Sequence, residues 1–301
     1  MKKNIIVSII ILGVILCIQS SAYANVYINH SVVANTFDVI TLIIAGVFVG
    51  VIGTLIGAGG GFLVVPFLII NYGFSPQHAV GTSMAVVFLN ALSGTFSYVS
   101  QKRVDYELGI KFSVFALPGV IIGTIIEQYI TVMMFSVIFS VLLLSIAYLL
   151  LFQKEFYLIC DNNTKSLTCR TLVDAHGNEY NFCPDMNIGF GGSFFIGIIS
   201  SLFGIGGGLI HVPLMTFIGV PVHVATATSH FTIVITSFIG LIIYMGLNTV
   251  DINYAIFIGI GSIYGAYVGA KLATITKEKV IKQIIAVALI IVAIKLVFNI
   301  I

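Results

Sequence analysis

The chain has 301 residues, of which 59% are hydrophobic and only 8% charged, and its mean hydropathy of +1.14 lies far above that of a soluble domain. Its 13 basic and 11 acidic residues nearly balance, which excludes the strongly basic surface typical of nucleic-acid-binding proteins. No Asp, Glu, Lys or Arg occurs in residues 39–101 or 186–250. Each of these stretches is too long for one membrane span of about 20 residues. The apolar segments are continuous rather than alternating, so the sequence predicts an all-α, polytopic helical membrane protein and not a β-barrel.

The N-terminus has the pattern of a secretory signal peptide over residues 1–24. Lys2 and Lys3 precede an apolar run at 5–18, and Ser21–Ala24 ends in an A-x-A sequence that favours cleavage after Ala24. The alternative is an uncleaved first helix. Both interpretations place residues 25–37 outside the cell.

The remainder divides into two transmembrane halves, 38–152 and 188–301, joined by a polar linker at 153–187. Each half contains five apolar segments. They run over 39–56, 62–72, 78–100, 107–126 and 131–152, then over 188–203, 209–219, 224–246, 253–272 and 280–299. The second segment of each half covers only about 17 Å as a helix, so it cannot cross a 30 Å hydrocarbon core alone. We expect a half-helix there.

A repeated motif stands directly before each half-helix. Gly57–Gly61 reads GAGGG and Gly204–Gly208 reads GIGGG, 147 residues later. Three consecutive glycines disfavour a helix by about 1 kcal/mol each relative to alanine. Further matches follow in order: Pro66 with Pro213, Ala79–Ser83 with Ala225–Ser229, Val104-Asp105 with Val250-Asp251, Gly119 with Gly265, and Gly123 with Gly269. The series indicates an internal duplication with a helix break in each copy.

Loop charges predict that the two copies are inserted in opposite orientations. In the first half the basic residues follow the third apolar segment, at Lys102, Arg103 and Lys111, whereas in the second half they follow the fourth. Under the positive-inside rule this reversal makes the halves inverted repeats and places the linker inside. The linker also carries Cys160, Cys169, Cys183 and His176 in no standard zinc spacing. We expect free thiols, with a local disulfide as the alternative if the segment faces an oxidising compartment.

Helix breaks inside a membrane offer an anion site. A half-helix that begins there leaves about four N–H groups unpaired at the positive end of its dipole, and glycine lets a ligand approach the backbone. Paired breaks in the two halves of a transporter mark its binding site. The candidate binding residues are Gly57, Gly59, Gly60, Gly61, Thr82, Ser83, Gly204, Gly206, Gly207, Gly208, Thr228 and Ser229. The alternatives are close helix packing at the glycines and back-bonding of the hydroxyls to helix carbonyls.

Two histidines break the symmetry of the halves. His211 stands where the first half has Val64, and His230 stands where it has Met84. A membrane-buried histidine can take up a proton and couple it to anion movement, so both are candidate proton-coupling residues. The alternative is a neutral histidine paired with a carbonyl. No Lys or Arg lies in the middle of an expected span, so the site lacks a basic clamp for phosphate, and no metal or other cofactor is expected.

These motifs resemble the sulfite exporter TauE/SafE family of membrane permeases. The resemblance rests on Gly57–Pro66 with Ala79–Ser83 and on Gly204–Pro213 with Ala225–Ser229, and it extends over about 38–301. It implies transport of small sulfur-containing anions, namely sulfite, sulfate, thiosulfate or organosulfonates, driven by ion or proton gradients. The leader, the cysteine-bearing linker and Ala227 in place of Gly81 depart from the usual family pattern.

We therefore expect a secondary transporter that works by alternating access in the bacterial inner membrane. A passive anion channel and a transporter of another small anion remain alternatives. A membrane enzyme using the linker cysteines is disfavoured, because the chain has no Cys-x-x-Cys pair, nucleophile elbow or metal triad. The particular anion, the direction of transport and the oligomeric state stay open.

Overall fold

The computed structural model describes residues 36–152, 169–273, 286–287 and 289–296. The leader predicted at 1–24 lies outside this part of the chain, as does Cys160. The first half forms α2 (Thr36–Ile56), α3 (Gly61–Tyr72), α4 (Pro76–Ser100), α5 (Tyr106–Glu127) and α6 (Val132–Phe152). The second half forms α7 (Met186–Phe203), α8 (Gly208–Phe217), α9 (Val222–Gly246) and α10 (Ile252–Leu272), and residues 286–287 and 289–296 are also helical.

Within the described residues, seven helices are long and apolar enough to cross a membrane: α2, α4, α5, α6, α7, α9 and α10. Helices α3 and α8 have only 12 and 10 residues. This confirms a polytopic helical membrane protein and the two short helices expected after the glycine motifs.

Matching capping residues begin the corresponding helices of the two halves. Asp105 accepts the N–H of Leu108 at the start of α5, and Asp251 accepts the N–H of Asn253 at the start of α10. The loops just before them also match, since Lys102 and Asn248 are the two non-glycine residues with positive φ among the described residues, both at 55°. Loops that share only the Val-Asp pair therefore form the same turn 146 residues apart.

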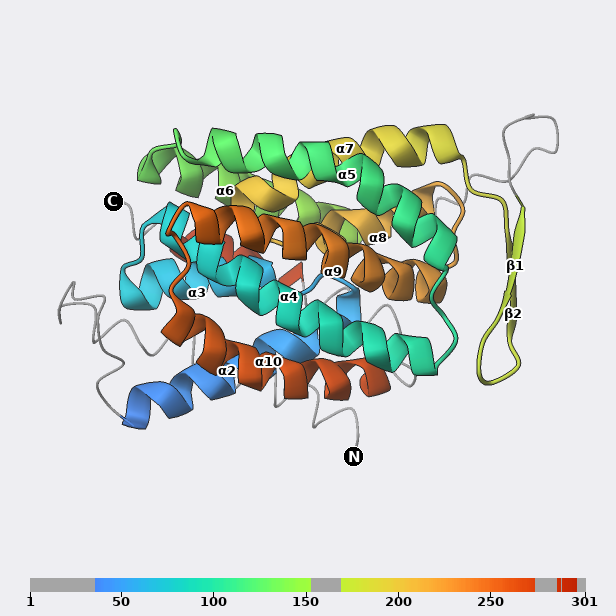
Figure 1. The fold of residues 1–301 in the computed structure, drawn as a ribbon, viewed down its shortest axis with the longest axis horizontal. Helices are drawn as coiled ribbons and strands as arrows, with labels where there is room; N and C mark the ends of the chain where they lie inside the picture. Colours follow the sequence, from blue (N-terminus) through green and yellow to red (C-terminus); the bar gives the residue numbers. More distant parts are fainter. Residues whose placement is uncertain (1–35, 153–168, 274–285, 288, 297–301) are drawn as a thin grey trace.

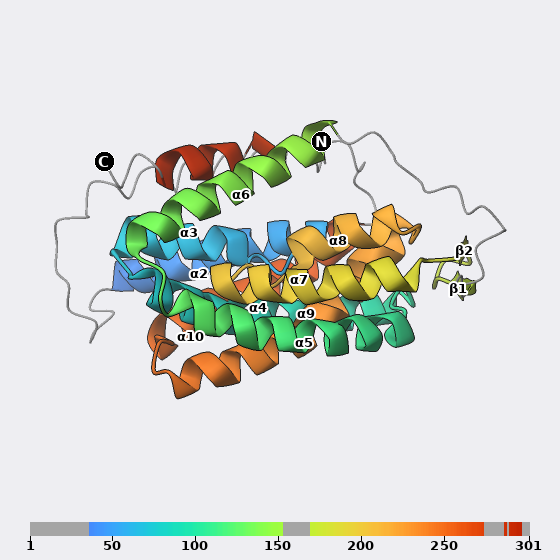
Figure 2. The ribbon, with the colours of Figure 1, turned by 90° about the horizontal axis from the view of Figure 1, so that it is seen from above.

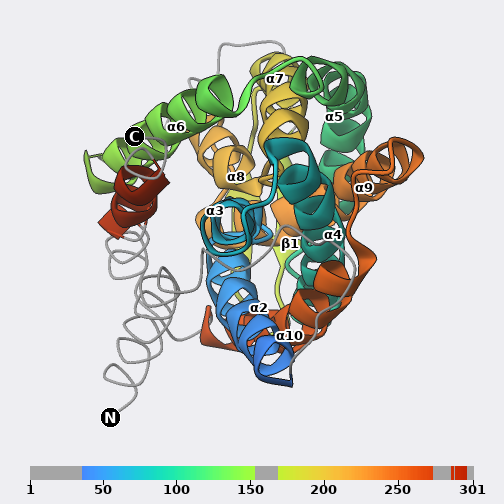
Figure 3. The same cartoon turned by 90° about the vertical axis from the view of Figure 1, so that its left-hand side faces the viewer.

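The first helix of each half packs on the other half. Figure 3 shows α2 beside α10 and α7 beside α5. Glycines bring these backbones together: a Cβ atom on Gly46 would lie 2.1 Å from the Ile258 carbonyl oxygen, and one on Gly119 would lie 2.1 Å from that of Phe194. Small residues of this kind allow membrane helices to approach closely. The halves are interlocked rather than separate lobes.

Corresponding helices run in opposite directions along the long axis of the molecule. In Figure 1, α4 runs from left to right and its counterpart α9 from right to left, in contact with each other. Helix α3 leaves the first glycine motif toward the left, while α8 leaves the second toward the right. The two glycine motifs consequently meet near the middle of the molecule.

Helix α6 and the helical residues 286–287 and 289–296 form a pair at the edge of the bundle (Figure 2). The Ser140 hydroxyl donates to the Ala293 carbonyl over 3.3 Å, and Phe135 and Phe139 pack against Phe203 of α7. In Figure 3 this pair lies on one side of α3 and α8, and α4 and α9 lie on the other side.

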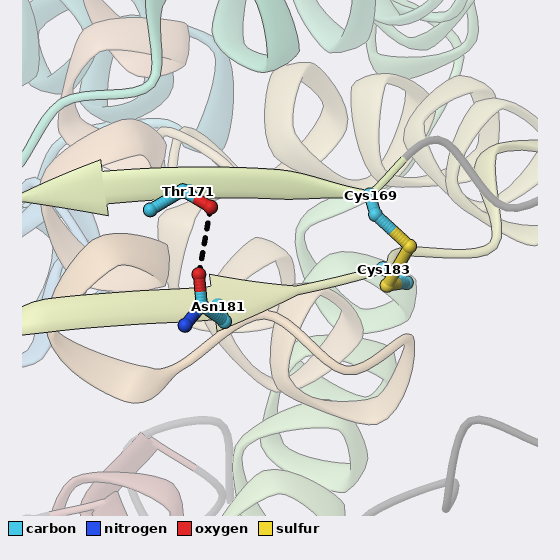
Figure 4. Close-up of a disulfide and its surroundings, with 4 residues drawn as sticks. All are labelled: Cys169, Thr171, Asn181 and Cys183. Carbon is cyan, nitrogen blue, oxygen red and sulfur yellow. Dashed lines mark hydrogen bonds between the residues drawn. A yellow bond between two sulfur atoms is a disulfide. The ribbon is translucent and has the colours of Figure 1, made fainter.

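The linker contains an antiparallel hairpin, β1 (Arg170–Val173) and β2 (Glu179–Phe182), closed by a disulfide between Cys169 and Cys183 (Figure 4). The expectation of free thiols is therefore wrong for these two cysteines. The strand register places Arg170 opposite Phe182, which brings the residues just outside the ladder face to face. Two strands of four residues in a polar segment gave no alternating apolar pattern from which to predict a sheet.

The hairpin is fastened to the loop between α4 and α5. Asp174 pairs with Arg103 over 3.3 Å, and Arg170 pairs with Asp105 over 3.0 Å. Hydrogen bonds from Asn178, from the N–H of His176 and from Arg103 hold the pKa of Asp174 well below its ordinary value. Because β2 continues into α7, these contacts join the second half to a loop of the first.

Candidate functional site

The two glycine motifs adopt the same backbone conformation. Gly57, Gly59 and Gly60 have φ values of 80°, 72° and 82°, and Gly204, Gly206 and Gly207 have 65°, 73° and 77°. This left-handed region is open to glycine and costly for other residues. The breaks are therefore built into the sequence by residues that cannot be replaced without strain.

Each break ends in an uncapped helix N-terminus. Gly60 and Gly207 occupy the N-cap positions of α3 and α8, and neither has a side chain to receive an N–H group. The backbone N–H groups of residues 59–62 and 206–209 have no hydrogen-bond acceptor among the described residues. Buried N–H groups are nearly always paired in proteins, so eight unpaired donors in two short segments form a site with a strong demand for an acceptor.

The two breaks cross in direct backbone contact. A Cβ atom on Gly61 would lie 2.0 Å from the carbonyl oxygen of Gly204, and one on Gly208 would lie 2.0 Å from that of Gly57. All ten residues of the two motifs are buried. The crossing places both positive helix ends in one buried region.

The predicted serines lie at this crossing and connect the halves reciprocally. The Ser83 hydroxyl donates to the Gly204 carbonyl over 2.9 Å, and the Ser229 hydroxyl donates to the Gly57 carbonyl over 3.1 Å. Each serine thus holds the break of the other half. These hydrogen bonds satisfy two buried carbonyl oxygens next to the unpaired N–H groups.

The predicted threonines directly precede these serines in the sequence, and they bond to loops rather than to the breaks. Thr82 accepts the N–H of Asp251 over 3.0 Å, and Thr228 accepts the N–H of Asp105 over 3.0 Å. Their oxygen atoms therefore fasten the loop of the opposite half. Their hydroxyl hydrogens have no acceptor within the part of the chain that the structure describes.

Two apolar side chains that sequence reasoning missed flank the middle glycines. Val87 and Ile233 are both fully buried, and each lies beside the Cβ directions of Gly59 and Gly206. They are 146 residues apart and therefore occupy equivalent positions of the repeat, so aligning the two halves could have identified them. Their apolar surface removes water from the crossing, which strengthens any electrostatic interaction with the N–H groups.

His230 lies in a polar cluster between the breaks and the hairpin end of the molecule. Its ring contacts the ring of Tyr98 at a centroid distance of 5.4 Å, and a Cβ atom on Gly94 would lie 2.9 Å from its Nε2 atom. The Tyr98 hydroxyl donates to the Thr54 carbonyl over 2.8 Å. Neither ring nitrogen of His230 meets a partner at full hydrogen-bond geometry in the described chain, although the side chain is fully buried; the backbone of Thr226, one turn earlier, is a polar group that acts on its ring.

His211 lies elsewhere, between α7 and α8. Its Nε2 atom is 3.2 Å from the Ser193 hydroxyl, its ring stacks on Phe112, and its Nδ1 atom has no partner among the described residues. The two histidines therefore belong to different clusters and are not brought into contact with each other.

A second polar cluster mirrors the one at His230. Tyr244 donates to the Ser201 carbonyl over 2.8 Å, as Tyr98 does to that of Thr54. Here Met84 takes the place of His230 beside Gly240, and Thr124 hydrogen-bonds Ser201. The tyrosines were missed because a single tyrosine in an apolar run has no distinctive local pattern, although their 146-residue separation marks them as a repeated pair.

Comparisons with known proteins agree with this architecture. Residues 42–296 match the model of the family described as sulfite exporter TauE/SafE. The chain is 32% identical to the probable membrane transporter protein YunE of Bacillus subtilis over 86% of this chain and 97% of YunE. It is 30% identical to a probable membrane transporter protein of Methanocaldococcus jannaschii over 77% of this chain and 85% of that relative. No solved structure matches the chain. The crossed helix breaks, the seven apolar helices and this match over most of the length show that the chain is a multi-pass membrane transporter of the sulfite exporter TauE/SafE family.

Proposed function

We propose that the protein is a secondary transporter of small sulfur-containing anions, such as sulfite, sulfate, thiosulfate or organosulfonates. The observation that carries the proposal is the pair of crossing helix N-termini, whose N–H groups at 59–62 and 206–209 have no acceptor among the described residues. Helix N-termini bind anions through such groups and through the helix dipole. The sulfur chemistry comes from the family description, and the anion chemistry comes from the geometry.

The binding site in this proposal consists of the twelve glycine and hydroxyl residues identified in the sequence. The described helices place their basic side chains away from the crossing: Lys111 pairs with Glu107 near the start of α5, Lys271 lies in the last turn of α10, and Lys295 belongs to the helical residues 289–296 that pair with α6 at the edge of the bundle. The open donors of the site are the backbone N–H groups of 59–62 and 206–209 and the hydroxyls of Thr82 and Thr228, because Ser83 and Ser229 donate to glycine carbonyls. Such donors suit a small oxyanion with one or two charges. A phosphate clamp would call for arginine or lysine instead.

The proposed mechanism is alternating access between two inverted repeats, with residues 38–152 moving against 188–301. The opposite directions of α4 and α9 and the reciprocal serine bonds support an inverted pseudo-twofold arrangement. In such transporters the substrate site lies at the repeat interface and opens to each side in turn. The hairpin contacts between Asp174 and Arg103 then belong to one end state, since they join the two halves.

Protons are the proposed coupling ion, with His230 as the first candidate carrier and His211 as the second. His230 is fully buried, has no partner at full hydrogen-bond geometry on either ring nitrogen among the described residues, and lies in the cluster next to the first break. A neutral imidazole that becomes charged there requires a compensating anion nearby, which links proton uptake to substrate binding.

The experiment is flux of labelled sulfite, sulfate and thiosulfate in proteoliposomes containing the purified protein. Gly60→Leu and Gly207→Leu should abolish the flux, because both positions have positive φ and hold the helix starts. Gly246→Leu is the matched control, since a Cβ atom there meets nothing within 4 Å. Uphill accumulation under an imposed pH gradient would exclude a channel. Wild-type-like flux in both break variants would refute the anion site.

A further inference from the structure

Glu127 is a buried acid that the proposed anion site does not use. It is the last residue of α5 and its relative exposure is 0%. Gln128 donates to its Oε2 atom over 2.8 Å, while its Oε1 atom has no hydrogen-bond partner among the described residues. An ionised carboxylate in this position would cost several kcal/mol unless a cation compensated it.

The surroundings of Glu127 form the second polar cluster, beyond the break of the second half. Thr124, one turn earlier on α5, hydrogen-bonds the Ser201 hydroxyl, and Tyr244 interacts with Thr124 and electrostatically with Glu127. From α4, Gln77 donates to the backbone carbonyls of Glu127 and Ile130 over 3.4 and 3.2 Å. Glu127 therefore lies at the end of α5 between the first turn of α4, which bonds its backbone, and Tyr244 of α9.

No cation compensates this carboxyl in the part of the chain that the structure describes. It forms no ion pair there, and α6 and α7, which border the cluster, contain no charged residue. The titratable residue acting on it from α9 is Tyr244, and α4 carries His78 next to Gln77. On the α9–α10 loop the carboxylate of Asp251 is occupied in capping α10.

The two polar clusters share their framework and differ in their titratable residues. Tyr98 and Tyr244 correspond, and so do Gly94 and Gly240. The cluster near the hairpin has His230 where the other has Met84, and the cluster at the far end has Glu127 where the repeat offset places Ala273. Each side of the crossing thus holds one ionisable group that its symmetry partner lacks.

We propose that Glu127 is a proton-binding residue of the transport cycle, exposed in turn on the side of the molecule opposite the hairpin. The inference rests on the proposed function. Glu127 lies about 30 Å along α5 from Glu107, which contacts the hairpin through Arg170. In the state described here the side chain is enclosed and carries its proton. When the far end opens, water enters and the proton leaves on that side. The proton that replaces it comes from the hairpin side, where His230 of the other cluster is the proposed donor, so each cycle moves one proton across the membrane, and the ionised carboxylate disfavours closure until that proton arrives.

The test separates coupling from binding in proteoliposomes. Glu127→Gln preserves the size and neutrality of the protonated acid, so exchange of external for internal labelled thiosulfate should persist. Accumulation driven by a pH gradient, and proton movement reported by internal pyranine during thiosulfate entry, should both be lost. Glu179→Gln, an exposed acid on the hairpin, is the control and should behave like wild type in all three measurements.

Wild-type-like pH-driven accumulation in Glu127→Gln would overturn the role of Glu127. If a sodium gradient drives accumulation in the wild type and Glu127→Gln loses it, the ion bound by Glu127 is sodium, and the assignment of a proton is wrong. Absence of exchange in wild type would instead refute the proposed function. If the variant fails to fold, dicyclohexylcarbodiimide, which modifies protonated carboxyls in apolar surroundings, is applied to the wild-type protein. A peptide adduct at Glu127 supports the inference, and its absence overturns it.

Discussion

Alanine in place of Gly61 or Gly208 should force the two helix breaks apart. The added Cβ atom would lie 2.0 Å from a carbonyl oxygen of the other break, whereas ordinary contact begins at 3.4 Å. One backbone must therefore retreat by about 1.4 Å, the difference between these two distances. Overpacking on this scale costs about 1–3 kcal/mol, and a displacement of about 1 Å within a binding site can reduce rates about 100-fold.

The measurement compares these variants with Gly191→Ala. At Gly191 in α7 a Cβ atom meets nothing within 4 Å, so alanine should be neutral or stabilising by up to about 1 kcal/mol. The protein contains no tryptophan, so thermal stability is best followed by size exclusion after heating, with anion flux measured in parallel. Gly61→Ala and Gly208→Ala should each unfold at a lower temperature and lose flux. Equal stability and flux in all three variants would refute the close crossing of the breaks.

Three further predictions concern the clusters and the hairpin. Tyr98→Phe and Tyr244→Phe each remove one buried 2.8 Å hydrogen bond and should lower the free energy of unfolding by about 1 kcal/mol, measured by thermal melting; unchanged stability in both would contradict these bonds. Reducing the Cys169–Cys183 disulfide, which spans 14 residues, should destabilise the hairpin by about 3 kcal/mol, seen as faster amide exchange of the hairpin. Identical exchange before and after reduction would show that the disulfide is not formed. The pKa of Asp174 is depressed in the folded state, so the stability that its carboxylate adds to the hairpin contacts is complete at neutral pH and declines as the pH falls below about 4. A spin label on the hairpin turn should gain mobility below that pH. Asp174→Asn should show the same mobility already at pH 7.

The helices and breaks could be predicted because their signals are local. Continuous apolar runs define the spans, and three consecutive glycines define each break, so the first nine predicted segments agree with the observed helices to within a few residues, while the bounds of the tenth lie outside the described residues. The repeat offset also led to Ser83 and Ser229. Their partners could not be predicted, since a hydroxyl that donates across 121 or 172 residues of chain leaves no periodic pattern.

Other features depend on packing between distant segments. That α2 packs on α10 rather than within its own half follows from backbone approach at Gly46 and Gly261, which resemble any other glycine in an apolar run. Glu127 looks like a residue at a membrane boundary because it ends an apolar segment, yet the N-terminal turn of α4 encloses it. The disulfide was one of two interpretations of the cysteines, and only the strand register brings Cys169 and Cys183 together.

The reciprocal serine bonds have a consequence for the origin of the chain. Each glycine break receives its hydroxyl donor from the opposite half, and α2 and α7 each pack against a helix of the opposite half. A polypeptide with the length of one half would therefore leave its own glycine carbonyl without a donor and its first helix without a partner. Two copies of such a polypeptide, inserted in opposite directions in the same membrane, would satisfy both needs. The contacts between the halves are thus those that an antiparallel dimer of two such polypeptides would make, and in this chain they are formed within one molecule.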